Sequence, residues 1–356
     1  MKRPKLRDDL ALMEGYHSPQ VEVDIRLNTN ESPEAPPDAW RDALAAELST
    51  LDWHRYPDRA AAGLRQGLAD QYRVDPSMVF AANGSNEVLQ SLLLAYGGPG
   101  RTAAVFEPTY ALHSHISRVT GTDVIEGERD ADFRLDPAEV DRVLDLEPDV
   151  VFLCSPNNPT GMVEPEALIR HVVDRAGESG ALVVVDEAYG QFARWSAVEL
   201  VSDDAPVVVS RTFSKTWSMA AARLGYLVAP TWVVQALESV VLPYHLDAAK
   251  QTAGRLALRY ADEMRDRVDR LVAERERIAA AFDQLPVEHW PSGANFILFR
   301  AEEMGGQELW QALLDRSILV RNCASWPRLD GCLRVTVGTP EENSVFLAAM
   351  TEILAS

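Results

Sequence analysis

The chain has 356 residues, of which 47% are hydrophobic and 25% charged, the composition of an ordinary globular protein long enough for two domains. Its Lys and Arg residues number 34 against 54 Asp and Glu, and the net charge of −20 argues against nucleic acid or a membrane surface as a partner. The start of the sequence, MKRPKLRDDL, lacks the apolar segment of a signal peptide, and Cys154, Cys323 and Cys332 show no paired spacing, so we expect a cytoplasmic protein with reduced thiols.

Between residues 59 and 250 the chain alternates between helical and strand-like segments. A short strand at 21–27 and a loop at 28–38 come first, and helix patterns follow at 59–73, 86–96 and 164–176. Short apolar runs separate the helices, at 102–108, 149–156, 181–189, 206–212 and 223–230. Because these runs are continuously apolar, they are typical of strands covered by helices on both faces, which predicts a mostly parallel α/β sheet. Ligands of such sheets bind beyond the carboxyl ends of the strands.

Beyond residue 250 the pattern becomes that of a smaller α+β unit. Residues 255–285 show one long, highly charged helix pattern, which we interpret as a helix joining two domains. Strand patterns follow at 294–300, 318–322 and 332–338, with helices at 306–316 and 341–354. We therefore expect an N-terminal arm (1–27), a large domain (51–250), and a small domain formed by 28–50 together with 251–356.

Polar residues follow several of the predicted strands, at the edge where a ligand is expected. In CSPNNPTG (154–161), prolines and a glycine fix a tight loop, and either Asn157 or Asn158 can present an amide there; a plain turn gives the same pattern. Asp186 follows a wholly apolar strand, where an unpaired carboxylate is costly, so it needs a cation, a metal or a cofactor as its partner. Taken alone, Asp186 is best explained by a buried salt bridge.

The segment SRTFSKTW (210–217) carries a lysine just after the end of an apolar strand. Lysine is rarely buried, and an amine at a sheet edge can lose its proton and attack an aldehyde to form a Schiff base. Thr212 and Ser214 supply hydroxyl groups beside Lys215, and Arg223, eight residues on, can return to the same place. Lys215 is therefore a candidate nucleophile.

Gly84, Ser85 and Asn86 lie at the start of the helix predicted at 86–96. The free N–H groups and the dipole of a helix start suit a phosphate, although simple N-capping by Ser85 or Asn86 is the commoner meaning of such a sequence. The histidines of HSH (113–115) have the spacing of a metal-binding pair, but no cysteine or carboxylate cluster accompanies them, so we predict no metal site.

Taken together, these clusters match a single ligand. They offer a helix start, hydroxyl groups and an arginine for a phosphate, an aspartate for a ring nitrogen, an asparagine and a tyrosine for an oxygen, and a lysine for an aldehyde. Pyridoxal 5′-phosphate (PLP) carries all four groups, and a Schiff-base lysine with an acidic partner for the pyridine nitrogen is its usual setting. A nicotinamide cofactor is excluded because no G-x-G-x-x-G follows any strand.

The order of the motifs NGSNE, PTY, SPNNPTG, VDEAY and SK, with an arginine eight residues after the lysine, resembles that of the fold type I, class II PLP-dependent aminotransferases. Within them the chain is most similar to the histidinol-phosphate aminotransferases, and the likeness extends through RLNTNESP, RYPD, LPYHL, SGANFILF and CLRVTVGT. The resemblance implies a large PLP-binding domain with a mostly parallel seven-stranded sheet, a smaller α+β domain and transamination as the reaction.

The resemblance also implies a role for each matching residue. Lys215 would form the Schiff base and carry a proton, and Asp186 would hold the ring nitrogen protonated. Asn158 and Tyr189 would bond the ring oxygen, and Tyr110 would stack on the ring face. The phosphate would be bound by Gly84, Ser85, Asn86, Thr212, Ser214 and Arg223. Tyr56, in RYPD, would reach the phosphate from a partner subunit, which implies a homodimer.

Four further residues match the family's substrate-binding positions: Tyr16, Asn28, Arg321 and Arg334. They imply L-histidinol phosphate as the amino donor and 2-oxoglutarate as the acceptor, in histidine biosynthesis; without the resemblance, surface ion pairing would explain the two arginines. Ser32 stands where the family usually has asparagine, and the loop 322–331 also differs from the common pattern. Both departures concern substrate recognition.

Two related activities share the same cofactor residues. An aromatic-amino-acid aminotransferase is the closest alternative, and a phosphothreonine-type PLP decarboxylase is a second. A PLP-sensing regulator would need a DNA-binding module, for which this acidic chain leaves no room.

Overall fold

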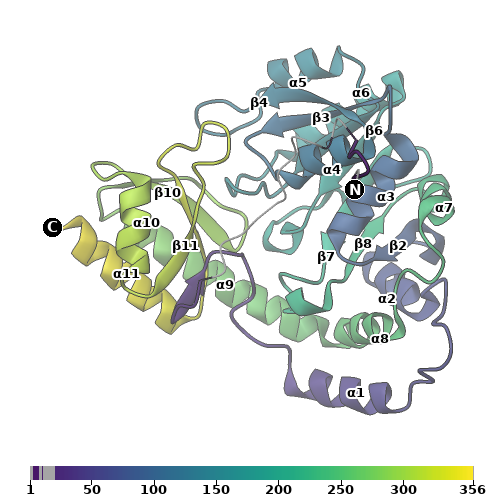
Figure 1. Ribbon diagram of the computed structural model, residues 1–356, viewed down its shortest axis with the longest axis horizontal. Coiled ribbons are helices and arrows are strands. Elements are labelled where there is room, and N and C mark those ends of the chain that lie inside the picture. Colours follow the sequence, from purple (N-terminus) through teal and green to yellow (C-terminus); the bar gives the residue numbers. More distant parts are fainter. Residues whose placement is uncertain (1–2, 8–9, 11–20, 356) are drawn as a thin grey trace.

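The computed structural model describes residues 3–7, 10 and 21–355, and in this part of the chain two sheets are joined by a long helix (Figure 1). The larger sheet has seven strands in the order β2-β8-β7-β6-β5-β3-β4. Strand β8 is antiparallel to both neighbours, and the other pairs are parallel. The strands are β2 (Val79–Ala82), β3 (Thr102–Glu107), β4 (Asp123–Glu128), β5 (Val150–Cys154), β6 (Leu182–Asp186), β7 (Val207–Thr212) and β8 (Gly225–Val228). The predicted seven-stranded, mostly parallel sheet is confirmed.

Helices cover both faces of this sheet, because its central strands are apolar on both sides. In β6, Val184 packs toward one face, whereas Val183 and Val185 pack toward the other, and all three are fully buried. The helices of the first face are α3 (Ser85–Tyr96), α4 (Leu112–Thr120) and α7 (Thr231–Val240). The opposite face is covered by α2 (Ala62–Tyr72), α5 (Pro137–Leu144), α6 (Glu166–Ser179) and α8 (Ala248–Ala257).

The smaller sheet has five strands in the order β1-β11-β12-β10-β9. They are β1 (Ile25–Leu27), β9 (Val287–His289), β10 (Phe296–Ala301), β11 (Ile318–Asn322) and β12 (Leu333–Thr336). Only the β1–β11 pair is parallel within this sheet, so the N-terminal segment is tied to the C-terminal part of the chain. Helices α9 (Ala261–Phe282), α10 (Gly306–Leu314) and α11 (Pro340–Leu354) pack on it, and α1 (Asp38–Ser49) packs on α8 (Figure 1). The division of the chain into domains stays a prediction.

The prediction of a single long helix over 255–285 is wrong. The chain instead forms α8, one 3-10 turn at Leu258–Tyr260, and then α9. Helix α8 packs against α1 and α2, whereas α9 packs against α11 and the smaller sheet, so the chain changes partners at this turn. The residues of this turn include no glycine or proline that would break a helix. We therefore attribute the break to tertiary packing. Further 3-10 turns are Pro76–Met78, Gly190–Phe192, Ala197–Leu200 and Ala220–Ala222.

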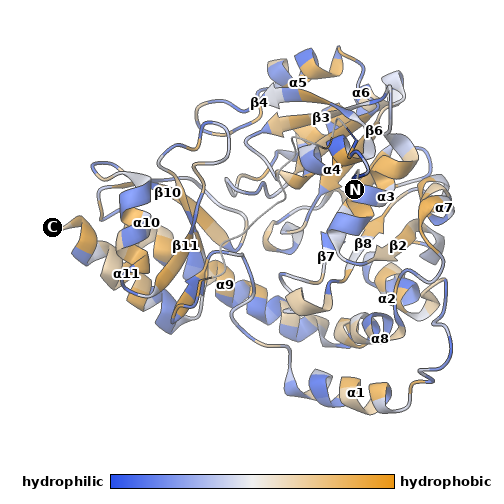
Figure 2. Ribbon diagram, in the orientation of Figure 1, coloured by the Kyte–Doolittle hydropathy of each residue, from blue (hydrophilic) through white to orange (hydrophobic). Residues whose placement is uncertain are grey.

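Hydropathy follows this architecture. Figure 2 shows mainly hydrophobic colours along β3 and β10, as expected for strands that are covered by helices. Among the described helices, none combines the length and the apolar character needed to cross a membrane.

Candidate active site

A cavity of about 270 Å³ lies at the carboxyl ends of β5, β6 and β7, on the side that faces the smaller sheet. Most of the residues predicted to bind the cofactor or substrate line it together: Asn28, Ser85, Asn86, Tyr110, Asn158, Asp186, Tyr189, Thr212, Ser214, Lys215, Arg223, Arg321 and Arg334. The topology explains this meeting, since the ends of parallel strands lie at one edge of a sheet.

Lys215 occupies the turn that follows β7. Its Nζ donates a hydrogen bond to the backbone oxygen of Thr29 at 3.0 Å and lies 5.8 Å from the ring centroid of Tyr189. Burial, together with the positive charges of Arg334 and Arg223, lowers the pKa of Lys215 to about 7, although the negative charge of Glu31 opposes this shift. A substantial fraction of this amine is therefore neutral near pH 7, as a nucleophile requires.

Asp186 ends β6 and is only 1% exposed. Its Oδ1 accepts the N–H of Ala188 at 3.0 Å, and its Oδ2 lies 3.0 Å from Nε2 of His113. The His113 ring stacks on Phe152 with centroids 4.7 Å apart. A buried salt bridge is the explanation expected for Asp186 taken alone, and the structure gives it the fully buried His113, which forms an ion pair with it when the imidazole is protonated. Sequence reasoning missed the histidine partner, and within the described ranges no group of three or more candidate ligands could hold a metal.

The start of α3 is open to an anion. Its N-cap is Gly84, no side chain caps it, and the alternative of capping by Ser85 or Asn86 is wrong. Gly84 has φ of +81°, a backbone conformation that favours glycine, and a Cβ there would lie 2.9 Å from Nη2 of Arg223 and would displace this end of the side chain. Arg223 donates from Nη1 to Oγ of Ser214 at 3.1 Å. Helix N–H groups, a hydroxyl and a guanidinium thus meet, which suits a phosphate.

The turn that carries Ser214 and Lys215 is held by Thr212. The Oγ1 of Thr212 accepts the N–H of Ser214 at 3.1 Å and donates to the backbone oxygen of Leu224 at 3.4 Å. On β8, a Cβ at Gly225 would lie 2.3 Å from the backbone nitrogen of Ser85, so only glycine lets β8 approach the start of α3.

Asn158 and Tyr189 face the cavity beside each other, and each has a partner from the other part of the molecule. Arg334 donates from Nη1 to Oδ1 of Asn158 and from Nη2 to the backbone oxygen of Asn28, the latter at 3.0 Å. Asn30 donates from Nδ2 to the hydroxyl oxygen of Tyr189 at 2.8 Å. Burial raises the pKa of Tyr189, so its phenol keeps its proton at physiological pH.

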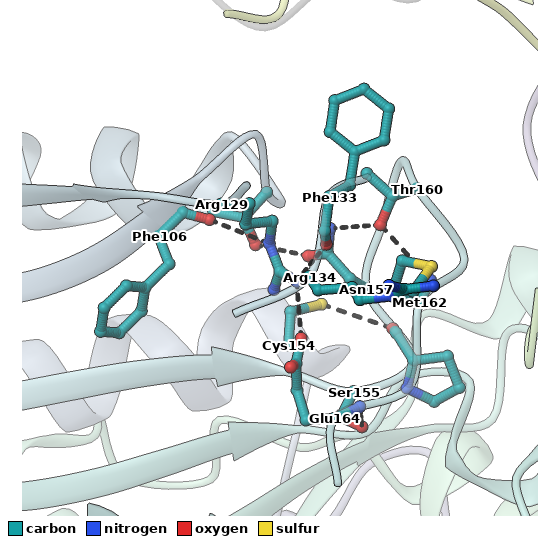
Figure 3. Close-up of polar contacts among 12 residues, drawn as sticks. Phe106, Arg129, Phe133, Arg134, Cys154, Ser155, Asn157, Thr160, Met162 and Glu164 are labelled. Atoms are coloured by element: carbon teal, nitrogen blue, oxygen red, sulfur yellow. Dashed lines mark hydrogen bonds and ion pairs between the residues drawn. The ribbon is translucent and has the colours of Figure 1, made fainter. Parts of the chain in front are cut away.

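The loop after β5 holds Asn158 in place through its neighbour Asn157 (Figure 3). Asn157 is fully buried, and its amide contacts Oγ1 of Thr109 at 2.7 Å, Oγ1 of Thr160 at 2.8 Å and the backbone oxygen of Pro108 at 3.0 Å. Of the two asparagines that the sequence left open, Asn157 is structural and Asn158 lines the cavity.

A buried ion pair also stabilises the loop after β5. The Nη1 of Arg129 lies 2.6 Å from Oε1 of Glu164, with both side chains almost fully excluded from solvent (Figure 3). Arg129 also donates to the backbone oxygens of Phe106 at 3.2 Å and Phe133 at 3.1 Å. The backbone N–H of Glu164 donates to Oγ of Ser155 at 3.0 Å, and this hydrogen bond joins the two ends of the loop.

Tyr110 lies on a third side of the cavity, just before α4. Its hydroxyl donates to Oδ1 of Asn86 at 3.2 Å, and its ring meets His113 edge-on at 5.4 Å. Tyr110 and Asp186 are thus connected through the same histidine.

Arg321 and Arg334 reach the cavity from the smaller sheet, where they are paired residues on β11 and β12. They are 8% and 5% exposed, so the alternative of surface ion pairing is wrong for both. The guanidinium of Arg321 lies 5.1 Å from the ring centroid of Trp326, and that of Arg334 lies 5.1 Å from Phe296. Two adjacent buried cations favour an anionic group on the substrate.

The unusual loop 322–331 connects the two sheets. Trp326 donates from Nε1 to the backbone oxygen of Thr109 at 3.0 Å, and Arg328 donates to the backbone oxygens of Glu107, at 2.6 Å, and Arg129. The loop that supports Arg321 is therefore bonded to the segment that leads into Tyr110.

Three predicted residues do not line this cavity. Gly84 lies next to Arg223, which does line the cavity. Tyr56 is 80% exposed and stacks on Tyr244 with centroids 4.5 Å apart, away from the cavity of its own chain. Tyr16 lies outside the described residues.

Comparison with known proteins agrees with this geometry. The family model of class I and II aminotransferases matches residues 22–350. The histidinol-phosphate aminotransferase of Mycolicibacterium smegmatis is 44% identical, with 98% of this chain and 93% of that protein covered. That of Frankia casuarinae is 43% identical, covering 98% and 90%.

Solved structures share the fold at lower identity. The histidinol-phosphate aminotransferase of Clostridium acetobutylicum superimposes with a TM-score of 0.85 at 20% identity, covering 93% of this chain and 99% of the other. The enzyme of Sinorhizobium meliloti, solved in complex with pyridoxal 5′-phosphate, gives 0.85 at 22%, covering 94% and 91%. The motifs, the cavity and the match over most of the chain lead to one conclusion: this protein belongs to the class I and II aminotransferase family.

Proposed function

We propose that the protein is a PLP-dependent transaminase that converts L-histidinol phosphate and 2-oxoglutarate to imidazole-acetol phosphate and L-glutamate, a step of histidine biosynthesis in the cytoplasm. Relatives that are 43–44% identical over nearly the whole chain carry the name of this activity. The observation that carries the choice of substrate is the pair of buried arginines, Arg321 and Arg334, at the wall of a cavity built for PLP.

The cavity fits PLP group by group. The uncapped start of α3, with Ser214 and Arg223, suits the phosphate, and the glycine at position 84 leaves the room that this arrangement needs. The buried carboxylate of Asp186 suits a protonated pyridine nitrogen, and the amine of Lys215, whose pKa is about 7, suits an aldehyde. When bound, PLP supplies an aldehyde that captures amino groups and a ring that withdraws electrons from the adjacent carbon.

Each of the chain's own groups has a defined task in this proposal. Asp186 would keep a proton on the ring nitrogen, and its bond to His113 would fix the orientation of the carboxylate. Lys215 Nζ would take the proton from the substrate's α-carbon, which its low pKa allows, and would deliver it to the carbon of the cofactor's aldehyde group, so that the proton changes position. Tyr110 would hold the ring from one face.

The substrate follows from charge. A phosphate accepts several charge-assisted hydrogen bonds and can engage both Arg321 and Arg334, which are neighbours across β11 and β12. The side-chain carboxylate of 2-oxoglutarate can use the same groups in the second half of the reaction. An aromatic amino acid would engage one of the two guanidinium groups with its carboxylate but would place its apolar ring against the other, at a cost of several kcal/mol, on the order of a hundredfold or more in kcat/KM.

We further propose a homodimer in which Tyr56 reaches the partner's phosphate site. Its exposed ring stacks on Tyr244 (41% exposed), and two more large exposed apolar side chains, Trp53 (71%) and Leu242 (77%), lie close to these residues in the sequence. Exposed apolar side chains gathered on one face are typical of a protein interface. Light scattering of the purified protein checks the mass of the dimer.

Steady-state kinetics with 2-oxoglutarate and three amino donors test the proposal. We expect L-histidinol phosphate to exceed phenylalanine and tyrosine in kcat/KM, and Arg321→Leu to reduce the value for histidinol phosphate far more than the values for the other two. If phenylalanine or tyrosine matched histidinol phosphate, the protein would be an aromatic-amino-acid aminotransferase. Release of CO₂ from a phosphorylated amino acid would identify a decarboxylase.

A further inference from the structure

The hydrogen bond between Asn30 and Tyr189 lies in the interior, beside the cavity. The two residues are 1% and 4% exposed, and Nδ2 of Asn30 is 2.8 Å from the hydroxyl oxygen of Tyr189. An amide nitrogen can donate hydrogen bonds but cannot accept them, so Tyr189 is the acceptor in this contact. The proton of its own hydroxyl group must then point elsewhere.

The orientation of the Asn30 amide is set by Thr336. The hydroxyl oxygen of Thr336 accepts the backbone N–H of Asn30 at 3.0 Å, and the same hydroxyl donates to Oδ1 of Asn30, also at 3.0 Å. Because Oδ1 is held by Thr336, Nδ2 is the end that faces Tyr189. A flip of the amide would break the bond that the Thr336 proton makes.

The backbone around Asn30 is held as firmly as its side chain. Asn30 has φ of +55°, a conformation that asparagine tolerates better than most residues, and Nδ2 of Asn295 donates to its backbone oxygen at 3.2 Å. Thr336 lies two residues after Arg334 on β12, so both side chains project from the same face of the smaller sheet. Thr336, which orients the amide of Asn30, thus comes from the strand that also carries Arg334.

We propose that Asn30 and Thr336 are positioning residues that fix the direction of the hydrogen bond made by Tyr189, so that Tyr189 presents its proton to the ring oxygen of the cofactor. The inference rests on the proposed function. Burial keeps the phenol protonated, and a donor at this position stabilises the oxygen in its ionised form. An acceptor at position 30 would instead attract the proton away from the cofactor.

The substitution Asn30→Asp tests this inference, since it nearly preserves the shape of the side chain but replaces the donor by an acceptor. The readout is the pH midpoint at which the visible absorption of the bound cofactor changes. The midpoint is the pH at which the bound cofactor loses the proton that the ionised ring oxygen helps to hold. A hydrogen bond that stabilises the ionised oxygen weakens this hold and therefore lowers the midpoint. Loss of the Tyr189 donor therefore raises the midpoint, by about one pH unit or more for one hydrogen bond to a charged group.

A double-mutant cycle separates the direction of the hydrogen bond from the added negative charge. The charge of a carboxylate at position 30 acts on the cofactor whether or not the hydroxyl group of Tyr189 is present. The carboxylate can redirect the hydroxyl proton only when that hydroxyl group is present. We expect Asn30→Asp to shift the midpoint much more in the wild-type protein than in a Tyr189→Phe background. Equal shifts in both backgrounds would overturn the proposal. The charged groups near the cavity are unchanged in all variants: Glu31, Asp186, Lys215, Arg223, Arg321 and Arg334.

Variants of Thr336 give a second test that does not alter charge. Thr336→Ser retains the hydroxyl and should leave the midpoint as in the wild type, whereas Thr336→Val releases the amide of Asn30 and should raise the midpoint. If valine and serine gave the same midpoint, Thr336 would have no part in orienting Tyr189. Failure of the proposed function is distinct, because the wild-type protein would then show no visible cofactor band at any pH.

Discussion

The buried pair Arg129–Glu164 allows a sharp prediction about stability. Replacing Glu164 by methionine keeps the approximate volume of the side chain but leaves the guanidinium of Arg129, in a side chain that is 1% exposed, without its carboxylate. Burial raises the pKa of Glu164 although Arg129 opposes this, so the pair is not in itself a large source of stability. The cost of the variant comes from the uncompensated charge, and we expect a loss of about 3–5 kcal/mol.

An exposed pair on α4 and β4, beside the same sheet, supplies the matched control. Arg118 and Glu126 lie 2.9 Å apart with side chains 49% and 54% exposed, and Glu126→Met should cost at most about 1 kcal/mol. Urea unfolding followed by tryptophan fluorescence measures both variants, at one protein concentration because the stability of the proposed dimer would depend on it. If Glu164→Met were no more costly than Glu126→Met, the loop that carries Asn158 would not depend on the ion pair.

Three further predictions concern the cofactor. Asp186→Asn should lower kcat by more than about tenfold, equivalent to about 1.4 kcal/mol of barrier, because an amide cannot keep the ring nitrogen protonated. The cofactor absorbance should show that PLP is retained. A smaller loss of kcat would make Asp186 a structural carboxylate. The rate at which the apoenzyme captures PLP, followed by stopped-flow absorbance, should rise with pH and level off above about 7, since only the neutral amine of Lys215 attacks. Well below that pH the rate should fall about tenfold per pH unit. A midpoint near 10 would contradict the lowered pKa of Lys215. Gly84→Ala should weaken PLP binding in a titration of the apoenzyme, because the positive φ and the contact with Arg223 impose strain of about 1–3 kcal/mol, and an unchanged affinity would refute this.

The strands of the larger sheet could be predicted where burial on both faces leaves an apolar run. Val183–Val185 of β6 and Val207–Val209 of β7 are such runs, and each is fully buried. Strand β4 (Asp123–Glu128) is different, because it lies at the edge of the sheet and several of its residues face solvent, so it has no apolar run to detect. The turn at Leu258–Tyr260 is likewise invisible in the sequence, since packing and not local preference breaks the helix there.

The cofactor side of the cavity was accessible from the sequence because each group follows a strand or opens a helix. Lys215 and Asp186 are conspicuous as polar residues next to apolar runs. Thr29 could not be found in this way, because it contributes a backbone oxygen that any residue would supply. His113 had one usable signal, the need of a buried carboxylate for a partner, but that partner lies 73 positions away and only the fold brings them together.

The central claim is that the cavity around Lys215 holds the cofactor, and a map of the modified lysine tests it most directly. The chain has only four lysines, at positions 2, 5, 215 and 250. Borohydride reduction should bleach the bound cofactor and fix it on the lysine that carries it, which peptide mass spectrometry then identifies. Lys250 is a demanding internal control, because its Nζ lies 2.8 Å from Oδ1 of Asn83, next to the start of α3. The account predicts the added mass on Lys215 alone; the mass on Lys250, or on no lysine, would contradict it.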